Sequence, residues 1–566
     1  MPKNDYSSWS KEDLIEKVNA LEKRKKYGLV WDSAREPEKV ILDCQKELPV
    51  LKEDKTKEII TNPNQPTHVL IEGDNYHALS VLNYTHQKAI DVIYIDPPYN
   101  TGSNSWKYNN KFVNSEDSFR HSKWLSFMSA RLRLSRNLLK DDGIIIVTID
   151  DHEIGNLILL MDDIFREENR LGVVTIMHNP RGRSDDKFFA TSHEYALFYG
   201  RNLKYSKTYR LKLTEEQANQ FPLEDTISRY RLLPLKRTGS NSTPDKRPNL
   251  YYPLYFNINT KTITSKHRDG KEWTTIYPVD SNGGKRVWRW GKTSFEERAA
   301  TEIVVKGENG KYAILAKDRI KAGRKPKTVW VDPKYDASSH GTILLQQMFN
   351  QSQTFDYPKS LYAVIDTLQI CVLEKKAATV LDFFAGSGTT GHAIMELNKA
   401  DGGTRQFILS TNNENNICTD VCYPRLEQVI KGYTSAKGDP FGGLGGNLKY
   451  YATSFVPATP TDKNKELLTK QSIEMLTLKE DTFEKVAENP SYVIYRNSDK
   501  YTGIIFDQLS FDQFKKAVAN VNIPISIYIF TLADDDFSDD FADMRGLIKI
   551  CAIPESILRV YRRIFR

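Results

Sequence analysis

Short, strongly apolar runs that each end at an acidic or glycine-containing turn constrain the fold of this chain more than any other feature. Runs without polar alternation are typical of strands buried on both faces of a parallel sheet. Helical patterns separate several of them, as the crossover connections of a parallel sheet require. The sequence therefore predicts an α/β fold with a doubly wound, Rossmann-like sheet. The predicted strands are residues 69–71, 90–95, 143–149, 379–383 and 406–409, the predicted helix is residues 122–139, and regular structure is also expected at residues 361–373.

A basic, aromatic and turn-rich segment separates the two stretches of this sheet pattern. Residues 201–334 contain 29 lysines and arginines against 14 aspartates and glutamates, whereas residues 462–566 contain 15 against 17. A basic middle beside a neutral end indicates a domain that binds a polyanion, with a solubilising surface as the alternative. At 566 residues the chain is too long for one core. The predicted domains are an N-terminal helical arm at residues 1–60, two halves of the sheet domain at 61–175 and 351–454, the basic insert at 176–350, and an α+β domain at 455–566.

Composition argues against several classes of protein. No apolar run approaches the roughly 20 residues that a membrane-spanning helix needs, and the first ten residues are polar, unlike a signal peptide. We therefore expect a cytoplasmic protein. Five scattered cysteines are too few for a disulfide framework. Cys418 and Cys422 fall about one helical turn apart, but no second pair of ligands follows them, so we expect no metal site.

The first motif that carries chemistry is a glycine-containing loop after the predicted strand at 379–383. Glycine permits a tight turn and a close approach of the backbone to a ligand. The loop lacks both the Gly-x-Gly-x-x-Gly spacing of dinucleotide sites and the Gly-Lys-Ser/Thr ending of a phosphate-binding loop. It suits the methionine end of S-adenosylmethionine, because Asp382 can accept hydrogen bonds from the ammonium group while loop amides donate to the carboxylate. A structural turn is the alternative. This glycine loop consists of Asp382, Phe383, Phe384, Ala385, Gly386, Ser387, Gly388 and Thr389.

A second motif directly follows the predicted strand at 90–95, at the strand end where doubly wound sheets bind ligands. Its prolines fix the backbone and remove amide donors, which leaves carbonyl oxygens free to point into a pocket. A carboxylate and a carbonyl there can accept both hydrogens of an exocyclic amine on a nucleic-acid base. A tyrosine ring beside them can stack on a base that has left the helix. For the tetrapeptide alone, a rigid turn is the alternative. This DPPY motif consists of Asp96, Pro97, Pro98 and Tyr99.

The order of these features (DPPY motif, basic insert, glycine loop) resembles the β group of amino-methyltransferases that act on DNA. The resemblance implies S-adenosylmethionine as the methyl donor and makes the insert a target recognition domain. Residues 355–360 resemble the family's cofactor segment before the glycine loop, and residues 73–75 resemble the strand end that contacts the cofactor adenine. The implied cofactor contacts outside the glycine loop are Asp74, Asn75, Lys359, Asn412 and Glu414.

More narrowly, the chain resembles the modification (Mod) subunit of type III restriction–modification systems. The segments that carry this likeness are residues 27–31, 96–102, 178–183, 192–195, 411–418 and 447–451. The likeness implies N6 methylation of adenine in double-stranded DNA (EC 2.1.1.72), a homodimer, a helicase–nuclease (Res) partner, and a prokaryotic, nucleoid-associated location. An orphan adenine methyltransferase and a cytosine-N4 methyltransferase, which usually has serine in place of Asp96, remain alternatives. The side chains expected at the DNA or the flipped base are Asn100, Thr101, Asn179, Arg181, Arg183 and His193.

Overall fold

The computed structural model describes residues 10–11, 14–15, 31, 38–109, 111–184, 186–308, 311–350, 355, 357–533, 535–544 and 548–565. Much of the predicted N-terminal helical arm, and the Mod-like residues 27–30, therefore lie outside the described residues. The chain divides into two compact units. Unit 1 comprises Met1–Tyr209 and Lys327–Arg566, and unit 2 comprises Arg210–Pro326.

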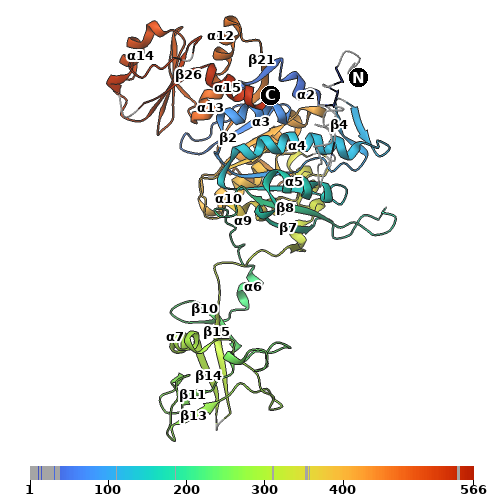
Figure 1. Ribbon diagram of the computed structural model, residues 1–566, viewed down its shortest axis with the longest axis vertical. Helices are drawn as coiled ribbons and strands as arrows, with labels where there is room; N and C mark the ends of the chain where they lie inside the picture. The colour runs from blue at the N-terminus through green and yellow to red at the C-terminus, as the bar shows by residue number, and fades with distance from the viewer. Residues whose placement is uncertain are drawn as a thin grey trace. The chain divides into compact units, whose positions relative to one another are not determined.

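Unit 1 is built on a ten-stranded mixed sheet (Figure 1). Six neighbouring strands, from β21 to β6, run parallel, whereas β1 is antiparallel to β21 and β8 is antiparallel to both β6 and β7. The predicted α/β fold with a doubly wound sheet is confirmed. In spatial order the strands are β1 (Glu47–Glu53), β21 (Asn447–Pro457), β2 (Thr67–Glu72), β18 (Gln406–Thr411), β17 (Thr379–Asp382), β3 (Ile90–Ile95), β6 (Leu139–Ile149), β8 (His193–Gly200), β7 (Arg170–Met177) and β16 (Val329–Trp330).

The winding of the sheet reverses between β17 and β3. From β17 the chain passes through α10 (Thr389–Asp401) to β18 on one side, and from β3 it passes through α4 (Arg120–Leu138) to β6 on the other. The two strands pair in parallel, with Leu381 opposite Ile93, so their carboxyl ends lie at the same edge. Doubly wound sheets bind ligands at such a switch point. The glycine loop follows β17 and the DPPY motif follows β3, so both motifs lie there.

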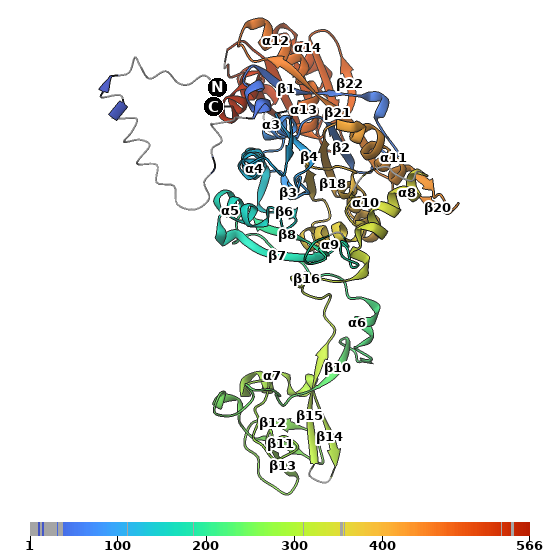
Figure 2. The ribbon, with the colours of Figure 1, turned by 90° about the vertical axis from the view of Figure 1, so that its right-hand side faces the viewer.

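Helices cover both faces of this sheet (Figure 2). One layer holds α3 (Asn75–Thr85), α4 and α5 (Ile154–Phe165), and the other holds α9 (Leu361–Val372), α10 and α11 (Tyr423–Lys431). Fully buried side chains such as Trp124 of α4 and Leu160 of α5 form the core with Ile145 of β6. This burial on both faces explains why the strands are apolar without alternation. Among the described residues, no helix is both long and apolar enough to cross a membrane.

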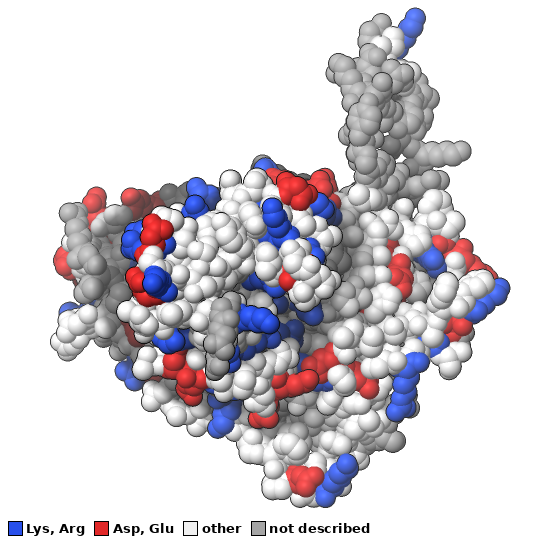
Figure 3. Space-filling model, turned by 90° about the horizontal axis from the view of Figure 1, so that it is seen from below, with Lys and Arg blue, Asp and Glu red and all other residues white. Residues whose placement is uncertain are grey.

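Unit 2 is a β-rich domain whose core includes Leu235, Trp288 and Phe295. The chain enters and leaves it side by side, because Leu211 and Arg324 form an antiparallel bridge. Residues 210–326 contain 24 lysines and arginines against 13 aspartates and glutamates. On the face of the molecule in Figure 3, basic and acidic side chains both occur and neither sign covers the whole face. The elements of unit 2 are α6 (Glu215–Asn219), β9 (Leu223–Glu224), β10 (Arg229–Pro234), β11 (Leu254–Asn257), β12 (Ile263–Thr264), β13 (Trp273–Ile276), α7 (Lys292–Glu302), β14 (Ile303–Glu308) and β15 (Lys311–Arg319).

The C-terminal part of unit 1 carries a second, five-stranded sheet. Its helices α13 and α15 pack against α3. Glu480 is buried there and accepts hydrogen bonds from the hydroxyls of Tyr528 at 2.6 Å and Ser526 at 3.0 Å. The elements are α12 (Asp462–Gln471), α13 (Ile473–Glu480), β22 (Glu484–Glu488), β23 (Tyr492–Arg496), β24 (Tyr501–Ile505), α14 (Phe511–Ala517), β25 (Ile525–Phe530), β26 (Ile548–Ile553) and α15 (Glu555–Ile564).

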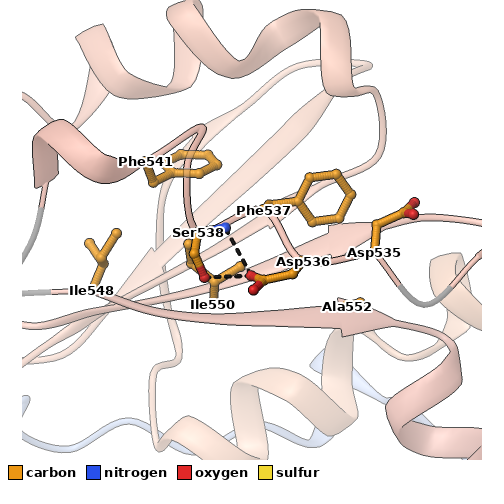
Figure 4. Close-up of a pocket in the computed structure, with 8 residues that line it drawn as sticks. All are labelled: Asp535, Asp536, Phe537, Ser538, Phe541, Ile548, Ile550 and Ala552. Carbon is orange, nitrogen blue, oxygen red and sulfur yellow. Dashed lines mark hydrogen bonds between the residues drawn. The ribbon is translucent and has the colours of Figure 1, made fainter.

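A pocket in this C-terminal part lies beside an acidic segment (Figure 4). Asp535 accepts a hydrogen bond from Thr531, and Asp536 accepts one from the backbone N–H of Ser538. Phe537 and Phe541 anchor the segment in an apolar cluster. Within the described residues, no group of three or more His, Cys, Asp or Glu side chains could hold a metal ion. The pocket is lined by Asp535, Asp536, Phe537, Ser538, Phe541, Ile548, Ile550 and Ala552.

Two domain limits differ from the predicted ones. The predicted insert at 176–350 is too wide, because β8 pairs with β6 in the main sheet and only Arg210–Pro326 form a separate unit. Strand β8 contains aromatic residues and follows a turn-rich segment, so its sequence is typical of a β-rich insert as well as of a sheet edge. The predicted N-terminal arm at 1–60 includes strand β1, which pairs with β21. It is therefore not only helical.

Candidate active site

The DPPY motif is fixed at the end of β3 by hydrogen bonds from three directions. Asp96 Oδ1 accepts from the Tyr99 hydroxyl at 2.8 Å and from Thr148 Oγ1 of β6 at 2.6 Å. The Pro98 carbonyl accepts from Trp124 Nε1 of α4 at 2.7 Å. Within the described residues, no hydrogen bond reaches the Pro97 carbonyl. The motif therefore presents a carboxylate and a carbonyl oxygen on a rigid backbone, as the chemistry of an amine pocket requires.

Lys359 lies in this pocket, with its ammonium among three oxygen atoms. Its Nζ is 3.1 Å from Asp96 Oδ1 and 2.5 Å from Glu194 Oε2, and it also donates to the Tyr99 hydroxyl. The same atom lies 4.6 Å from the centroid of the Tyr99 ring. The resemblance implied a cofactor contact for Lys359, whereas the structure places its ammonium on the DPPY motif and on Glu194. The pocket thus accommodates a nitrogen that carries several N–H groups.

The charges in the pocket stabilise one another. Burial alone would lower the pKa of Lys359, but the carboxylates of Asp96 and Glu194 outweigh it, so the pKa is raised. Burial alone would raise the pKa of Glu194, but the Lys359 ammonium outweighs it, so that pKa is lowered. Burial and the nearby Asp96 charge raise the pKa of Tyr99 well above its ordinary value. At neutral pH the pocket therefore holds an ionised Lys359–Glu194 pair and a protonated tyrosine.

In the glycine loop, Asp382 is buried at the end of β17. Its carboxyl group accepts from the Phe384 N–H at 2.9 Å and from Thr390 Oγ1 at 2.6 Å. Burial raises the pKa of Asp382 to about 7. A cationic ligand such as an ammonium group would compensate this buried carboxylate. Gly386 and Gly388 have φ values of 50° and 77°, a conformation that favours glycine.

Arg425 of α11 binds the glycine loop through its side chain. Its fully buried guanidinium donates to Thr389 Oγ1 at 2.8 Å and to Ser387 Oγ at 3.2 Å. Burial lowers the pKa of Arg425 to about 10, so it stays charged at neutral pH. Ser387 and Thr389, which were predicted as cofactor contacts, are buried like Asp382, and their hydroxyls bind Arg425. Their contact with the cofactor stays a prediction.

The strand end at Asp74 and Asn75 is connected to the glycine loop. Asn75 Nδ2 donates to the Phe383 carbonyl at 3.1 Å. Arg131, buried on α4, donates to Asn75 Oδ1 at 2.5 Å and to both oxygens of Glu38 at 2.8 Å. Asp74 caps α3 by accepting from the Tyr76 N–H at 2.7 Å. The two residues therefore adjoin the loop, as their predicted cofactor role requires.

The remaining groups around the loop fit a polar cofactor. The Ser410 hydroxyl at the end of β18 is buried and has no hydrogen-bond partner within the described residues. It adjoins the loop, because the Ala385 N–H donates to the Ser410 carbonyl at 3.1 Å. Asn412 and Glu414 follow β18 and are exposed, and Glu414 forms an ion pair with Lys107. The residues present thus fit the ammonium, carboxylate and ribose of S-adenosylmethionine.

Of the side chains expected at DNA, Arg181 and Arg183 are exposed, and Asn179, Thr101 and His193 are half-buried. His193 Nε2 lies 2.9 Å from the Tyr195 hydroxyl. Asn100 differs from its prediction because it is fully buried, with a φ of 58°. Its amide donates to Glu153 Oε1 at 2.5 Å and accepts from Trp106 Nε1 at 3.1 Å. In this structure the Asn100 side chain is therefore held inside the protein by Glu153 and Trp106.

Sequence reasoning missed four residues that organise the site, namely Thr148, Trp124, Glu194 and Arg425. Each lies far along the chain from the group that it contacts. The one available signal was the Mod-like segment 192–195, which contains Glu194.

A model of a DNA methylase family matches residues 90–421, which include both motifs and more than half of the chain. The chain belongs to the DNA methylase family. The match begins at β3 and runs through the glycine loop, so it covers the whole switch point of this methylase. The predicted DNA methyltransferase activity and the S-adenosylmethionine cofactor are confirmed at the level of the family.

Two relatives by sequence agree with this membership. The type II methyltransferase M.KpnI of Klebsiella pneumoniae is 35% identical over 62% of this methylase and 82% of the relative. The type III EcoPI Mod subunit of Escherichia phage P1 is 32% identical over 64% of this methylase but only 60% of the relative. The solved structure of an M1.HpyAVI–SAM complex is 13% identical, covering 64% of this methylase and 97% of that chain, with a TM-score of 0.28. The predicted resemblance to Mod subunits is therefore confirmed, and the match spans about three fifths of the EcoPI Mod subunit.

Proposed function

We propose that this methylase transfers a methyl group to the N6 amine of an adenine that has been flipped out of double-stranded DNA. The observation that carries the proposal is the place of the Lys359 ammonium, which contacts Asp96, Glu194 and Tyr99 together. A pocket whose oxygens converge on one nitrogen also suits an exocyclic amine. The neighbouring glycine loop, with the buried Asp382, supports binding of the methyl donor at the same sheet edge.

The residues of the pocket have distinct tasks in this proposal. Asp96 accepts one N–H of the amine, and the Pro97 carbonyl accepts the other. Both bonds draw electron density onto the nitrogen and orient its lone pair. S-adenosylmethionine supplies the methyl group when bound, and the new N–C bond forms as the C–S bond breaks. The amine then loses a proton to Asp96, directly or through water. When the target amine displaces the Lys359 ammonium from Asp96, Glu194 keeps its ion pair with that ammonium.

The target base is tested by nucleoside analysis of DNA after incubation with purified protein and labelled S-adenosylmethionine. We expect N6-methyladenine, because Asp96 stands where cytosine-N4 enzymes usually have serine. Label on N4-methylcytosine would overturn the adenine assignment and favour a cytosine-N4 methyltransferase. Sequencing the methylated DNA would report the recognition site in the same experiment.

We also propose that unit 2 reads the DNA sequence and that the chain acts as a homodimer with a helicase–nuclease partner. The support is the likeness to the EcoPI Mod subunit and the excess of basic residues in unit 2. Gly291-Lys292-Thr293 lacks the first glycine of a Gly-x-x-x-x-Gly-Lys-Ser/Thr motif, because Arg286 stands at that position, and in this proposal ATP-driven cleavage is assigned to the partner chain. Copurification with a large ATPase supports this role. A methylase that purifies alone and methylates DNA is instead an orphan enzyme.

A further inference from the structure

The loop that joins β7 to β8, residues 178–192, leaves the sheet beside the active site (Figure 1). Its last residues lead directly into His193 and Glu194, and Glu194 contacts both Lys359 and Tyr99 in the pocket. The tip of this loop therefore belongs to the same structural element as Glu194, which forms one wall of the pocket.

The neck of the loop is closed by backbone hydrogen bonds. The Asn179 N–H donates to the Ser192 carbonyl at 3.1 Å, and the Arg183 N–H donates to the Thr191 carbonyl at 3.1 Å. Gly182 has a φ of 69°, and a Cβ atom added there would lie 2.6 Å from the Cβ of Ala190. The two sides of the loop, residues 179–183 and 190–192, are thus packed against each other and fix the base of its tip.

The tip presents two consecutive aromatic rings to solvent. Phe188 is 83% exposed and Phe189 is 88% exposed. Exposed aromatic surface is costly unless a ligand covers it. The charged neighbours carry an excess of one positive charge, with Arg181, Arg183 and Lys187 against Asp185 and Asp186 in the sequence. The three basic side chains are exposed, whereas the Asp186 carboxylate accepts the N–H of Thr191 at 2.8 Å. Lys187 Nζ lies 5.2 Å from the centroid of the Phe188 ring.

We propose that Phe188 and Phe189 form an aromatic wedge that enters the DNA base stack where the target base leaves it. The inference rests on the proposed function, because it concerns the same DNA. Extruding a base breaks its stacking and pairing, which costs a few kcal/mol. Apolar side chains inserted between base steps offset such unstacking, and an aromatic ring can stack on the bases that flank the gap. Arg181, Arg183 and Lys187 would then contact the adjacent phosphates.

The test compares the full-length protein with the Phe188→Ala/Phe189→Ala double variant on two duplexes. In one the target adenine is paired, and in the other it faces an abasic site, so that its pairing is already lost. On the paired duplex we expect kcat/KM to fall about 10- to 100-fold, which corresponds to the few kcal/mol of extrusion. On the abasic duplex we expect a clearly smaller loss, because pairing no longer adds to the cost and only the stacking of the target base remains to be offset.

Three further measurements make the test specific. The fluorescence of 2-aminopurine at the target position should rise on binding of the wild type and rise much less with the double variant. The Phe188→Trp/Phe189→Trp variant should restore both readouts. As a matched control, Leu509→Ala removes an equally exposed apolar side chain, 93% exposed, from the C-terminal part of the chain and should change neither.

Two results would overturn the wedge alone: undiminished activity of the double variant on the paired duplex, or an equal loss on both duplexes. Unchanged DNA methylation with lost binding to a second protein chain would assign the two rings to a protein interface. A wild-type chain that methylates no DNA would overturn the proposed function and the wedge together.

Discussion

Glu194 shows how one residue outside the predicted motifs governs the active site. It is buried, and its carboxylate offsets the Lys359 ammonium beside Asp96. Replacing Glu194 by glutamine would leave Asp96 as the one carboxylate in contact with that ammonium, and the ammonium would then compete with the target amine for Asp96. We expect Glu194→Gln to lower kcat about 10- to 100-fold while the Kd for S-adenosylmethionine changes less than about threefold. Glu194→Asp should restore part of the activity. A variant that loses cofactor binding to the same degree would contradict this positioning role.

Asp382 gives the methylase a predictable pH dependence. Burial raises its pKa to about 7, so the carboxyl group of the free protein is protonated below that pH. An ammonium group needs the carboxylate, and we therefore expect affinity for S-adenosylmethionine to weaken as the pH falls below 7, by up to about tenfold per unit. Equilibrium binding between pH 5.5 and pH 8.5 measures this. Affinity that is constant over the range would contradict the assignment.

The raised pKa of Asp382 also predicts that the free energy of unfolding falls as the pH rises, whereas cofactor affinity increases. A carboxyl group with a raised folded-state pKa destabilises the fold as the pH rises from its unfolded pKa to its folded pKa. Asp382→Asn removes this cost. We expect the variant to exceed the wild type in free energy of unfolding by about 1–4 kcal/mol at pH 8, to come within about 1 kcal/mol of it near pH 4.5, and to bind the cofactor weakly at both. Denaturant unfolding at the two pH values checks the sign.

At the residue scale, the sequence predicted the groups that end strands. Asp96 and Asp382 follow apolar runs, so their meeting at one sheet edge was predictable. The partners of these groups were not, because Thr148, Glu194 and Arg425 come from strands and helices distant in the chain. Asn100 adjoins the DPPY motif in sequence, but its burial depends on Glu153 and Trp106.

At the scale of elements, helix α10 follows the glycine loop directly and packs closely against α11 and β18. A Cβ atom on Gly391 would lie 2.6 Å from Leu426 Cδ2 and 3.1 Å from Leu409 Cδ1, both buried. We expect Gly391→Ala to lower the free energy of unfolding by about 1–3 kcal/mol through overpacking. Gly155→Ala on α5 is the matched control, because nothing lies within 4 Å of its added Cβ, and it should be neutral or slightly stabilising. Equal effects of the two substitutions would contradict this packing argument.

The strands of the sheet centre were predictable, and those at its margins were not. β3 and β17 are apolar on both faces, so their sequences resemble only a buried strand. β8 lies near the edge and is antiparallel, and its pairing with β6 spans some 50 residues. β1 pairs with β21 from the other end of the chain. Local sequence cannot specify such long-range pairing.

At the scale of the whole molecule, cofactor binding and DNA reading should be separable. Leu211 and Arg324 form a bridge where the chain enters and leaves unit 2, so a short glycine–serine turn can replace residues 212–323. We expect this deletion to leave the Kd for S-adenosylmethionine within about threefold and to abolish site-specific methylation, because most basic residues of the insert are lost. Retention of site-specific methylation would show that unit 2 does not read DNA.

In the proposed function, the ends of β3 and β17 form one site with divided tasks, in which Asp96 serves the target amine and Asp382 serves the cofactor. Asp96→Ala tests it most directly when cofactor binding and single-turnover methyl transfer are measured on the same preparation. We expect a Kd for S-adenosylmethionine within about threefold of the wild type and a transfer rate lower by about 10²-fold or more. Transfer at a wild-type rate by this variant would show that Asp96 does not serve the target amine.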